Sequence, residues 1–139
     1  MKKPKAGYTS ADEVEAAFYT AFIHCDLQAM QTLWARDDAV CVHPGAEPIK
    51  GYEDILRSWE SIFSGAEAAH VRINTIQRIV GDDLVVHMVE EHIGAPGVAG
   101  QWAMVFATNV YRRDGRDWLM VAHTASVMHI QQTAGPTLQ

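Results

Sequence analysis

The sequence predicts an α+β fold in which helices come first and antiparallel strands follow. Between about residues 10 and 65, apolar residues recur at spacings of three and four, which is typical of helices that bury one face. From His70 onwards, apolar residues alternate with polar ones or run continuously between turn signals, which is typical of strands. This order of elements indicates one α+β domain with a helical half and a strand half.

Three helices are expected in the first half. Ser10 and Glu13 stand in the arrangement of a capping box, so the first helix should begin after Ser10. Asp26 can cap a second, shorter helix. A third helix should follow Gly51 and stop at Gly65. The residues expected to face the core are Val14, Ala17, Phe18, Ala21, Phe22 and Cys25, then Leu27, Met30, Leu33 and Trp34, then Tyr52, Ile55, Leu56, Trp59, Ile62 and Phe63.

Six extended segments are expected. They cover residues 39–43, 48–50, 70–80, 84–93, 101–112 and 118–129. The first two can pair as a hairpin, and Asp114-Gly115 is a hairpin signal between the last two. The first long strand is expected to place Val71, Ile73, Thr75, Gln77 and Ile79 on one face. The stretch 94–100 is expected to be a flexible loop, and the tail after Gln131 is expected to fray.

The last three strands are expected to be apolar on both faces. Trp102, Met104 and Phe106 oppose Ala103, Val105 and Ala107, while Trp118, Met120 and Ala122 oppose Leu119, Val121, Ala125 and Val127. An antiparallel sheet with one face in water would alternate apolar and polar residues. We therefore expect helices on one face and a second copy of the chain on the other, giving a homodimer through the sheet. A sheet that curls and covers itself is the alternative.

Composition excludes several classes of partner. The chain has 139 residues, which suits a single domain over residues 1–139 with its core at about 10–130. The formal net charge of -6 argues against nucleic acid or an anionic membrane as the main partner. The absence of a long apolar stretch and of a signal-peptide pattern predicts a cytoplasmic protein without a membrane span. Cys25 and Cys41 lie in apolar runs and are expected to be reduced, with a disulfide as the alternative.

His43 is the first candidate for chemistry. It follows the apolar run 39–42, and the turn residues Pro44 and Gly45 come directly after it. A neutral histidine at the end of a strand can accept a proton near neutral pH, because its reference pKa is about 6.5. A capping or turn role for His43 is the alternative.

Glu91 and His123 are the further catalytic candidates. Glu91 shares a strand face with Val85, His87, Val89 and Ile93, and a carboxylate on an apolar face must be paired, neutral or at the rim. His123 lies near Val121 and Ala125, so it is either catalytic or a satisfied core histidine. The pattern leaves open which face of the strand points to the interior.

No metal and no cofactor is expected. His87 and Glu91 are four residues apart on one strand, or about 13 Å, which is too far for ligands at about 2.1 Å from one ion. Glu90 and His92, about 6.6 Å apart, lack a third ligand nearby. No glycine-rich phosphate loop and no nucleophile motif is present in the sequence.

Five segments carry a resemblance to a known family. They are residues 25–30, 42–45, 48–51 leading to Ser58-Trp59, 107–112 and 118–123. With the order of elements, they make roughly residues 12–127 similar to the nuclear-transport-factor-two-like superfamily, especially its SnoaL-like and ketosteroid-isomerase-like members. The resemblance implies a cone-shaped curved antiparallel sheet wrapped around the N-terminal helices, a cystatin-like α+β roll. It also implies an apolar cavity and a dimer.

The resemblance implies roles for particular residues. In ketosteroid isomerases a carboxylate base precedes a proline at the end of the first strand, and His43 occupies that place. The tyrosine of the oxyanion hole falls at Phe18, with Tyr19 expected to point to a different side. The second oxyanion donor falls near Thr108 or Asn109. These replacements argue against steroid isomerisation.

Two functions remain open. One is a cofactor-independent isomerase, cyclase or hydrolase that uses His43 as general base on a small apolar or carbonyl-containing molecule. The other is a non-catalytic ligand-binding or oligomerisation domain. A cavity of about 300 Å³ or more with converging polar groups would favour binding or catalysis. The residues expected to touch a ligand are Phe18, Tyr19, Trp34, Trp59, Thr108 and Asn109.

Overall fold

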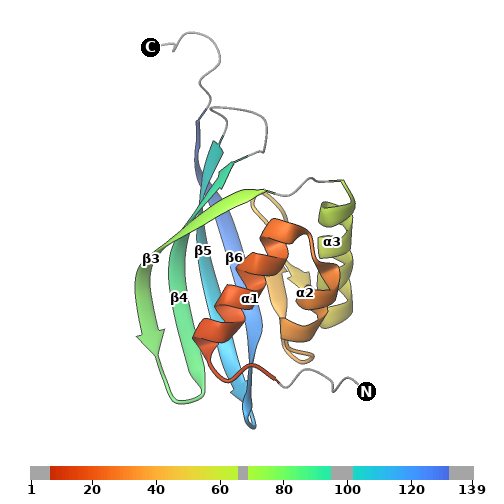
Figure 1. Ribbon diagram of the computed structural model, residues 1–139, viewed down its shortest axis with the longest axis vertical. Helices are drawn as coiled ribbons and strands as arrows, with labels where there is room; N and C mark the ends of the chain where they lie inside the picture. The colour runs from red at the N-terminus through yellow and green to blue at the C-terminus, as the bar shows by residue number, and fades with distance from the viewer. Residues whose placement is uncertain (1–6, 66–68, 95–101, 132–139) are drawn as a thin grey trace.

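The computed structural model describes residues 7–65, 69–94 and 102–131. The described residues form three helices, α1 (Ala11–His24), α2 (Leu27–Leu33) and α3 (Tyr52–Ser64), and six strands, β1 (Val40–Val42), β2 (Ile49–Lys50), β3 (His70–Val80), β4 (Leu84–Gly94), β5 (Trp102–Asp114) and β6 (Asp117–Gln131), as Figure 1 shows. Apart from Gly94, the predicted loop and the predicted frayed tail lie outside the described residues. In the described part of the chain, each helix is too short or too polar to cross a membrane.

The helices begin where their capping residues predict. The side chain of Ser10 accepts a hydrogen bond from the backbone N–H of Glu13 at 3.1 Å, and Asp26 accepts one from the backbone N–H of Ala29 at 3.1 Å. These bonds satisfy N–H groups that the first turn of a helix leaves unpaired. Gly51 precedes α3 with a φ of 98°, a conformation that favours glycine.

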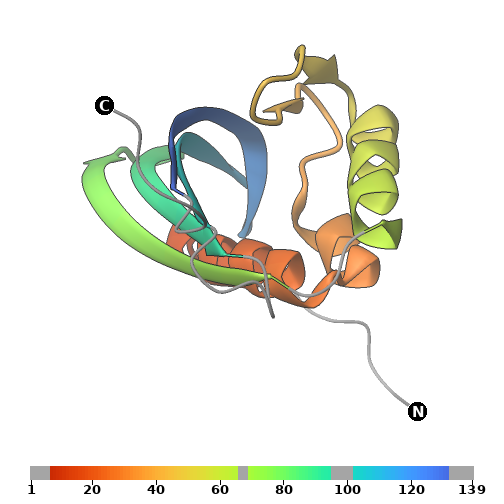
Figure 2. The same cartoon turned by 90° about the horizontal axis from the view of Figure 1, so that it is seen from above.

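The strands form one curved sheet in the order β2-β1-β6-β5-β4-β3. The predicted α+β class is confirmed, and Figure 2 shows strands β3 to β6 arching around α1, with α3 on the side of β1 and β2. The short strands β1 and β2 pair as the predicted hairpin. One difference is that β1 runs parallel to β6, so the sheet is mixed and not wholly antiparallel.

Burial identifies the face of the sheet that packs on the helices. In β4, Val85, His87, Val89 and Glu91 are buried, whereas the alternate residues are half-buried or exposed. We refer to the face that carries these four residues as the inner face and to the opposite one as the outer face. The largest core side chains are Trp34, Trp59, Tyr111, Phe18, Met30, Leu33, Ile55 and Met120.

A β-bulge in β3 changes the faces that simple alternation predicts. The register against β4 shifts between Thr75 and Gln77, so Arg78 comes to lie opposite His87. The prediction that Gln77 and Ile79 share the face of Thr75 is therefore wrong. A bulge adds one residue to a strand and moves all later side chains to the other face.

A second bulge does the same in β6. Tyr111 pairs with Met120, but Val110 pairs with Ala122, so one residue of β6 is skipped. Met120 and Ala122 were predicted to share a face and instead lie on opposite faces. The shift places His123 on the inner face, where it is 2% exposed.

Candidate functional site

A row of hydrogen-bonded side chains crosses the inner face from β4 to β6. The hydroxyl of Tyr19 donates to Glu91 Oε2 at 2.6 Å, and Nδ2 of Asn109 donates to the Tyr19 hydroxyl at 2.9 Å. Nδ1 of His123 lies 2.6 Å from Oδ1 of Asn109. All four side chains are buried. We refer to Glu91, Tyr19, Asn109 and His123 as the polar chain.

The hydrogen bonds of the polar chain run in one direction. Because Asn109 donates to Tyr19 through its nitrogen, its oxygen faces His123 and can only accept. His123 therefore carries its proton on Nδ1, and Nε2 is the acceptor nitrogen. Among the described residues, neither His123 Nε2 nor Glu91 Oε1 has a hydrogen-bond partner. The two ends of the polar chain thus keep one polar atom each that can bind another group.

Burial shifts the acid–base behaviour of the β4 end. Loss of solvation raises the pKa of Glu91 to about 7, and the hydrogen bond from Tyr19 partly opposes that rise. Burial, followed by the nearby charge of Glu91, raises the pKa of Tyr19 far above its usual range. Glu91 can therefore gain or lose a proton near neutral pH, while Tyr19 remains a hydrogen-bond donor.

Burial has the opposite effect on the two histidines. Loss of solvation lowers the pKa of His123 to about 3, and the neighbouring His43 adds to that shift. Loss of solvation also lowers the pKa of His43. Both imidazoles are therefore neutral at pH 7, and each keeps a nitrogen lone pair that can accept a proton.

His43 follows β1 and faces α3. Its Nε2 lies 2.9 Å from the hydroxyl of Ser58, which donates its one proton to the carbonyl of Ile55 at 2.6 Å. The Ser58 oxygen must then accept from His43 Nε2, which leaves Nδ1 as the acceptor nitrogen of His43. The carbonyl of His43 also accepts from the backbone N–H of Ala46 at 2.9 Å, so His43 takes part in the turn as well.

Aromatic rings pack against both histidines. The ring centroid of Trp59 lies 4.8 Å from that of His43 and 6.3 Å from that of His123. The ring of Phe18 lies 4.9 Å from His123 and 5.6 Å from Trp59. We refer to this group as the aromatic cluster, which consists of Phe18, Phe22, Trp59 and Phe63.

Trp59 brings an unpaired donor to this cluster. Its indole nitrogen is fully buried and has no hydrogen-bond partner in the described part of the chain. Leaving such a donor unpaired costs about 1–3 kcal/mol. A carbonyl, hydroxyl or carboxylate oxygen on a bound molecule would satisfy this N–H. The indole nitrogen of Trp34 is unpaired too. Trp34 packs against Phe18 and forms a β-bridge with Met120, and it does not belong to the aromatic cluster.

The structure brings most of the predicted site residues together, namely Phe18, Tyr19, Trp34, His43, Trp59, Glu91, Asn109 and His123. Thr108 is the exception, because it pairs with Met88 and Thr124 on the outer face and does not reach this group. Tyr19 was expected to point to a different side from Phe18, but the two rings meet edge-on with 4.8 Å between their centroids, and the Tyr19 hydroxyl extends to Glu91. Ser58 was not predicted, since a serine within a helix carries no local signal of a histidine partner.

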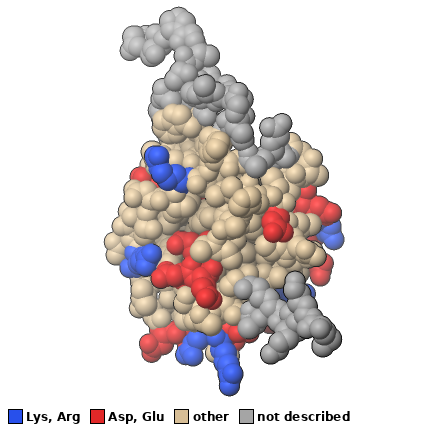
Figure 3. All heavy atoms as spheres, viewed as in Figure 1, with Lys and Arg blue, Asp and Glu red and all other residues tan. Residues whose placement is uncertain are grey.

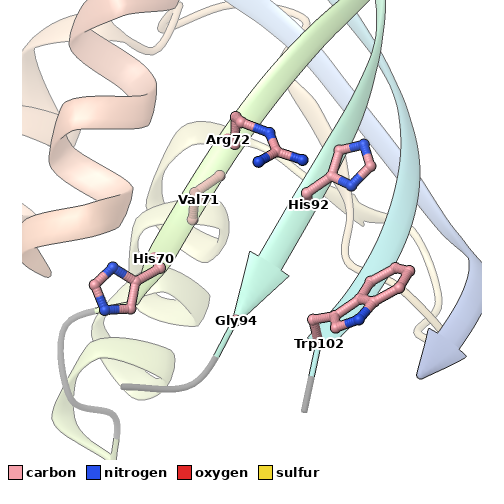
Figure 4. Close-up of a pocket in the computed structure, with 6 residues that line it drawn as sticks. All are labelled: His70, Val71, Arg72, His92, Gly94 and Trp102. Atoms are coloured by element: carbon pink, nitrogen blue, oxygen red, sulfur yellow. The ribbon is translucent and has the colours of Figure 1, made fainter. Parts of the chain in front are cut away.

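A separate hollow of about 630 Å³ lies on the outer face (Figure 4). It is located where β3 begins, β4 ends and β5 begins. Its lining residues are His70, Val71, Arg72, His92, Gly94 and Trp102. Arg72 pairs with His92 across the two strands, and Figure 4 shows its guanidinium extending towards the His92 ring. Because His92 and Glu91 are consecutive in β4, their side chains leave opposite faces. This hollow is therefore distinct from the group around the polar chain.

Comparison with known proteins decides the family. Residues 12–130 match the model of the SnoaL-like domain. The chain belongs to the SnoaL-like domain family. This confirms the resemblance to the NTF2-like superfamily, whose members include isomerases, dehydratases and ligand-binding proteins. One fold with several activities leaves the activity of this SnoaL-like chain to be argued from its site.

Two solved structures and one curated protein illustrate the range of relatives. A proposed calcium/calmodulin-dependent protein kinase type II association domain from Thiobacillus denitrificans is 33% identical, with 90% of this chain and 100% of that chain covered and a TM-score of 0.83. A proposed dehydratase of the NTF2-like family from Streptomyces avermitilis is 28% identical, with coverage of 84% and 91% and a TM-score of 0.75. F-box protein SKIP8 of Arabidopsis thaliana is 28% identical over 118 residues, which are 84% of this chain and 49% of that protein. The chain thus spans about half the length of that curated relative.

Proposed function

We propose that this SnoaL-like protein binds a small, largely apolar molecule that carries a carbonyl group, and that it moves a proton at the carbon next to that carbonyl. One observation carries the proposal. Trp59 Nε1 is buried without a hydrogen-bond partner among the described residues, and His123 Nε2 and Glu91 Oε1, at the two ends of the polar chain, also have no partner there. A ligand oxygen would accept a hydrogen bond from Trp59 Nε1, and the aromatic rings would hold the apolar part of the ligand.

The protonation states support a proton transfer without a cofactor. His43 is neutral at pH 7 and keeps a lone pair on Nδ1, so it can remove a proton from the carbon next to the carbonyl. The electron pair of that C–H bond forms the carbon–carbon double bond of an enol. The carbonyl oxygen takes a proton from Glu91, whose pKa of about 7 allows it to donate at neutral pH. Return of a proton to another carbon would complete an isomerisation.

The similarity to a proposed dehydratase at 28% identity favours the same chemistry, because dehydration also begins with removal of a proton from carbon. In that case the enol would expel a hydroxide, which leaves as water after protonation, and no proton would return to carbon. Both reactions need a neutral base and an acid around one apolar site, which is the combination that His43 and Glu91 offer.

Hydrogen exchange on a model ketone tests the base without knowledge of the natural substrate. In heavy water, we expect the protein to accelerate the loss of the NMR signals of the protons next to the carbonyl of 2-tetralone. His43→Gln should slow this exchange by about 100-fold or more, the usual contribution of a general base. His92→Gln is the matched control, because His92 lies on the outer face and should leave the rate unchanged.

Two results would count against this proposal. An exchange rate that is the same in His43→Gln as in the wild type would exclude His43 as the base. Saturable binding of 2-tetralone without any exchange would exclude the proton transfer and favour the non-catalytic ligand-binding function.

A second copy of the chain is proposed as the cover of the outer face. Ile79 and Leu84 are 53% and 49% exposed there, and half-buried Val86, Met88 and Val110 continue the apolar surface across β4 and β5. Exposed apolar surface of this kind is typical of an interface. The 33% identity to a proposed association domain supports assembly through this fold.

Sedimentation velocity tests this assembly. The wild type is expected to sediment as a dimer, and Met88→Glu should shift it to monomer, because a charge in the middle of the outer face cannot be buried unpaired. Ile62→Glu is the control, since Ile62 is 38% exposed on α3, away from the sheet. A wild type that remains monomeric at all concentrations would exclude the dimer.

A further inference from the structure

A second polar cluster lies where α1 begins, apart from the polar chain. Asp12 and Glu15 are three residues apart in α1, so their side chains lie on the same side of the helix. The imidazole of His87, from β4, faces both of them. Its Nδ1 lies 3.0 Å from Glu15 Oε2, and its Nε2 lies 3.6 Å from Asp12 Oδ1. Figure 3 shows acidic side chains gathered over α1.

These three side chains have the donor atoms and the spacing of a metal site. One ligand atom from each of Asp12, Glu15 and His87 lies within 4.8 Å of the other two. With ligand bonds of about 2.0–2.2 Å, two ligand atoms of a tetrahedral zinc ion lie about 3.3–3.6 Å apart. Because Glu15 faces Nδ1 of His87 and Asp12 faces Nε2, one ion would bind Nδ1 beside Glu15, and the exposed side chain of Asp12 would rotate to that side.

The buried members of the cluster are held in place by neighbours. His87 is 1% exposed, and its ring meets the ring of Tyr111 edge-on with 5.2 Å between centroids. The hydroxyl of Tyr111 donates to Glu15 Oε2 at 3.4 Å. Metal ligands are oriented by outer contacts of this kind. Two of the three ligands are therefore already positioned by packing.

The cluster is also open to solvent on one side. A hollow of about 230 Å³ is lined in part by Asp12, His87 and Arg78. It offers a path for an ion and room for a water molecule as a fourth ligand. Nη1 of Arg78 lies 3.5 Å from Asp12 Oδ1, and its half-exposed side chain can move away when an ion takes over the charge of Asp12.

We propose that Asp12, Glu15 and His87 bind one divalent transition-metal ion of the zinc type. An imidazole nitrogen favours such ions over magnesium and calcium, which prefer ligand sets made of oxygen. The bound ion would connect the first turns of α1 to β4. Because the unfolded chain does not hold these residues together, binding would also stabilise the folded state.

Zinc titration of the full chain tests the site. After removal of metals with a chelator, competition with a coloured zinc indicator is expected to show one zinc ion bound per chain. Asp12→Asn and His87→Asn should each weaken zinc binding by at least 10-fold. Zinc should also raise the melting temperature of the wild type and not that of Asp12→Asn. An excess of magnesium should not displace the zinc.

Two control variants distinguish this site from other places where zinc could bind. Glu13→Gln removes a carboxylate next to Asp12, but Glu13 instead accepts a hydrogen bond from Thr9, so zinc affinity should not change. His92→Asn disrupts the pair in which His92 Nε2 lies 3.6 Å from Glu90, and it should also leave zinc affinity unchanged.

Several outcomes would overturn the proposal. One is the absence of stoichiometric zinc binding, in which case the cluster is an ion-pair network alone. Another is a loss of binding in His92→Asn with none in Asp12→Asn. If the buried His87→Asn variant does not fold, the exposed Asp12→Asn variant decides the question by itself.

Discussion

Glu91→Gln is expected to make the protein about 3 kcal/mol more stable at pH 8. Burial raises the pKa of Glu91 to about 7 from its ordinary value of 4.5, so the ionised carboxylate costs the folded state about 3 kcal/mol. At pH 8 the folded wild type therefore holds an ionised carboxylate in a buried position. Glutamine has nearly the same shape, keeps an acceptor for Tyr19 and carries no charge.

The pH dependence of stability gives a sharper test, because two groups oppose each other. Glu91 has a raised pKa, so its contribution is present below about pH 4.5 and is lost as the pH rises towards about 7. His123 has a pKa lowered to about 3, so its contribution is present above about pH 6.5 and is lost as the pH falls towards 3. Between about pH 4.5 and 6.5 the two slopes offset each other in the wild type.

Removing Glu91 should therefore reveal the slope that His123 produces. Relative to the wild type, the stability of Glu91→Gln is expected to rise by about 1.4 kcal/mol per pH unit between pH 4.5 and 6.5, because the opposing slope of Glu91 is removed. Urea denaturation at pH 4.5, 5.5, 6.5 and 8 measures both curves. Glu90→Gln on the outer face is the control and should follow the wild type. Parallel curves for the wild type and Glu91→Gln would show that folding does not shift the pKa of Glu91.

Phe18→Ala is expected to lower the free energy of unfolding by about 3–5 kcal/mol, the usual cost of truncating a fully buried phenylalanine. Phe18 is completely buried. Its ring touches the rings of Tyr19, Phe22, Trp34, Trp59 and His123. Because these rings come from two helices, β6 and the end of α2, the neighbours cannot all move in to fill the cavity.

Chemical denaturation at pH 7 measures this loss. Phe22→Ala is the matched control, since Phe22 lies one turn later on the same helix and is only half-buried, so its loss should be clearly smaller. Equal losses for the two variants would mean that Phe18 is not the centre of this packing.

Signals that act over a few residues were enough to predict most of the secondary structure. Capping by Ser10 and Asp26 involves a backbone N–H three residues away, so the helix starts follow from the sequence. The Asp114-Gly115 signal predicted the β5–β6 hairpin, and Gly115 takes the positive φ of 67° that this turn requires. The family resemblance then supplied the architecture into which these elements fit.

Side-chain direction along the strands could not be predicted in the same way. Alternation placed His123 on the face opposite Met120, and the bulge in β6 brings the two to the same face. A bulge is a property of two paired strands, since it depends on where the partner offers its hydrogen bonds. No pattern within residues 118–129 alone carries that information.

The sequence by itself determined the family, the helices and strands, and the residue types that could do chemistry, among them His43, Glu91 and His123. Which of these side chains meet was decided by the tertiary structure. Tyr19 is 72 residues from Glu91 and 90 from Asn109, and Glu15 is 72 from His87, yet each pair is in contact. Such contacts depend on how a helix crosses a curved sheet, and local spacing does not encode that geometry. For this reason a search for metal ligands along β4 alone could not find the cluster of Asp12, Glu15 and His87.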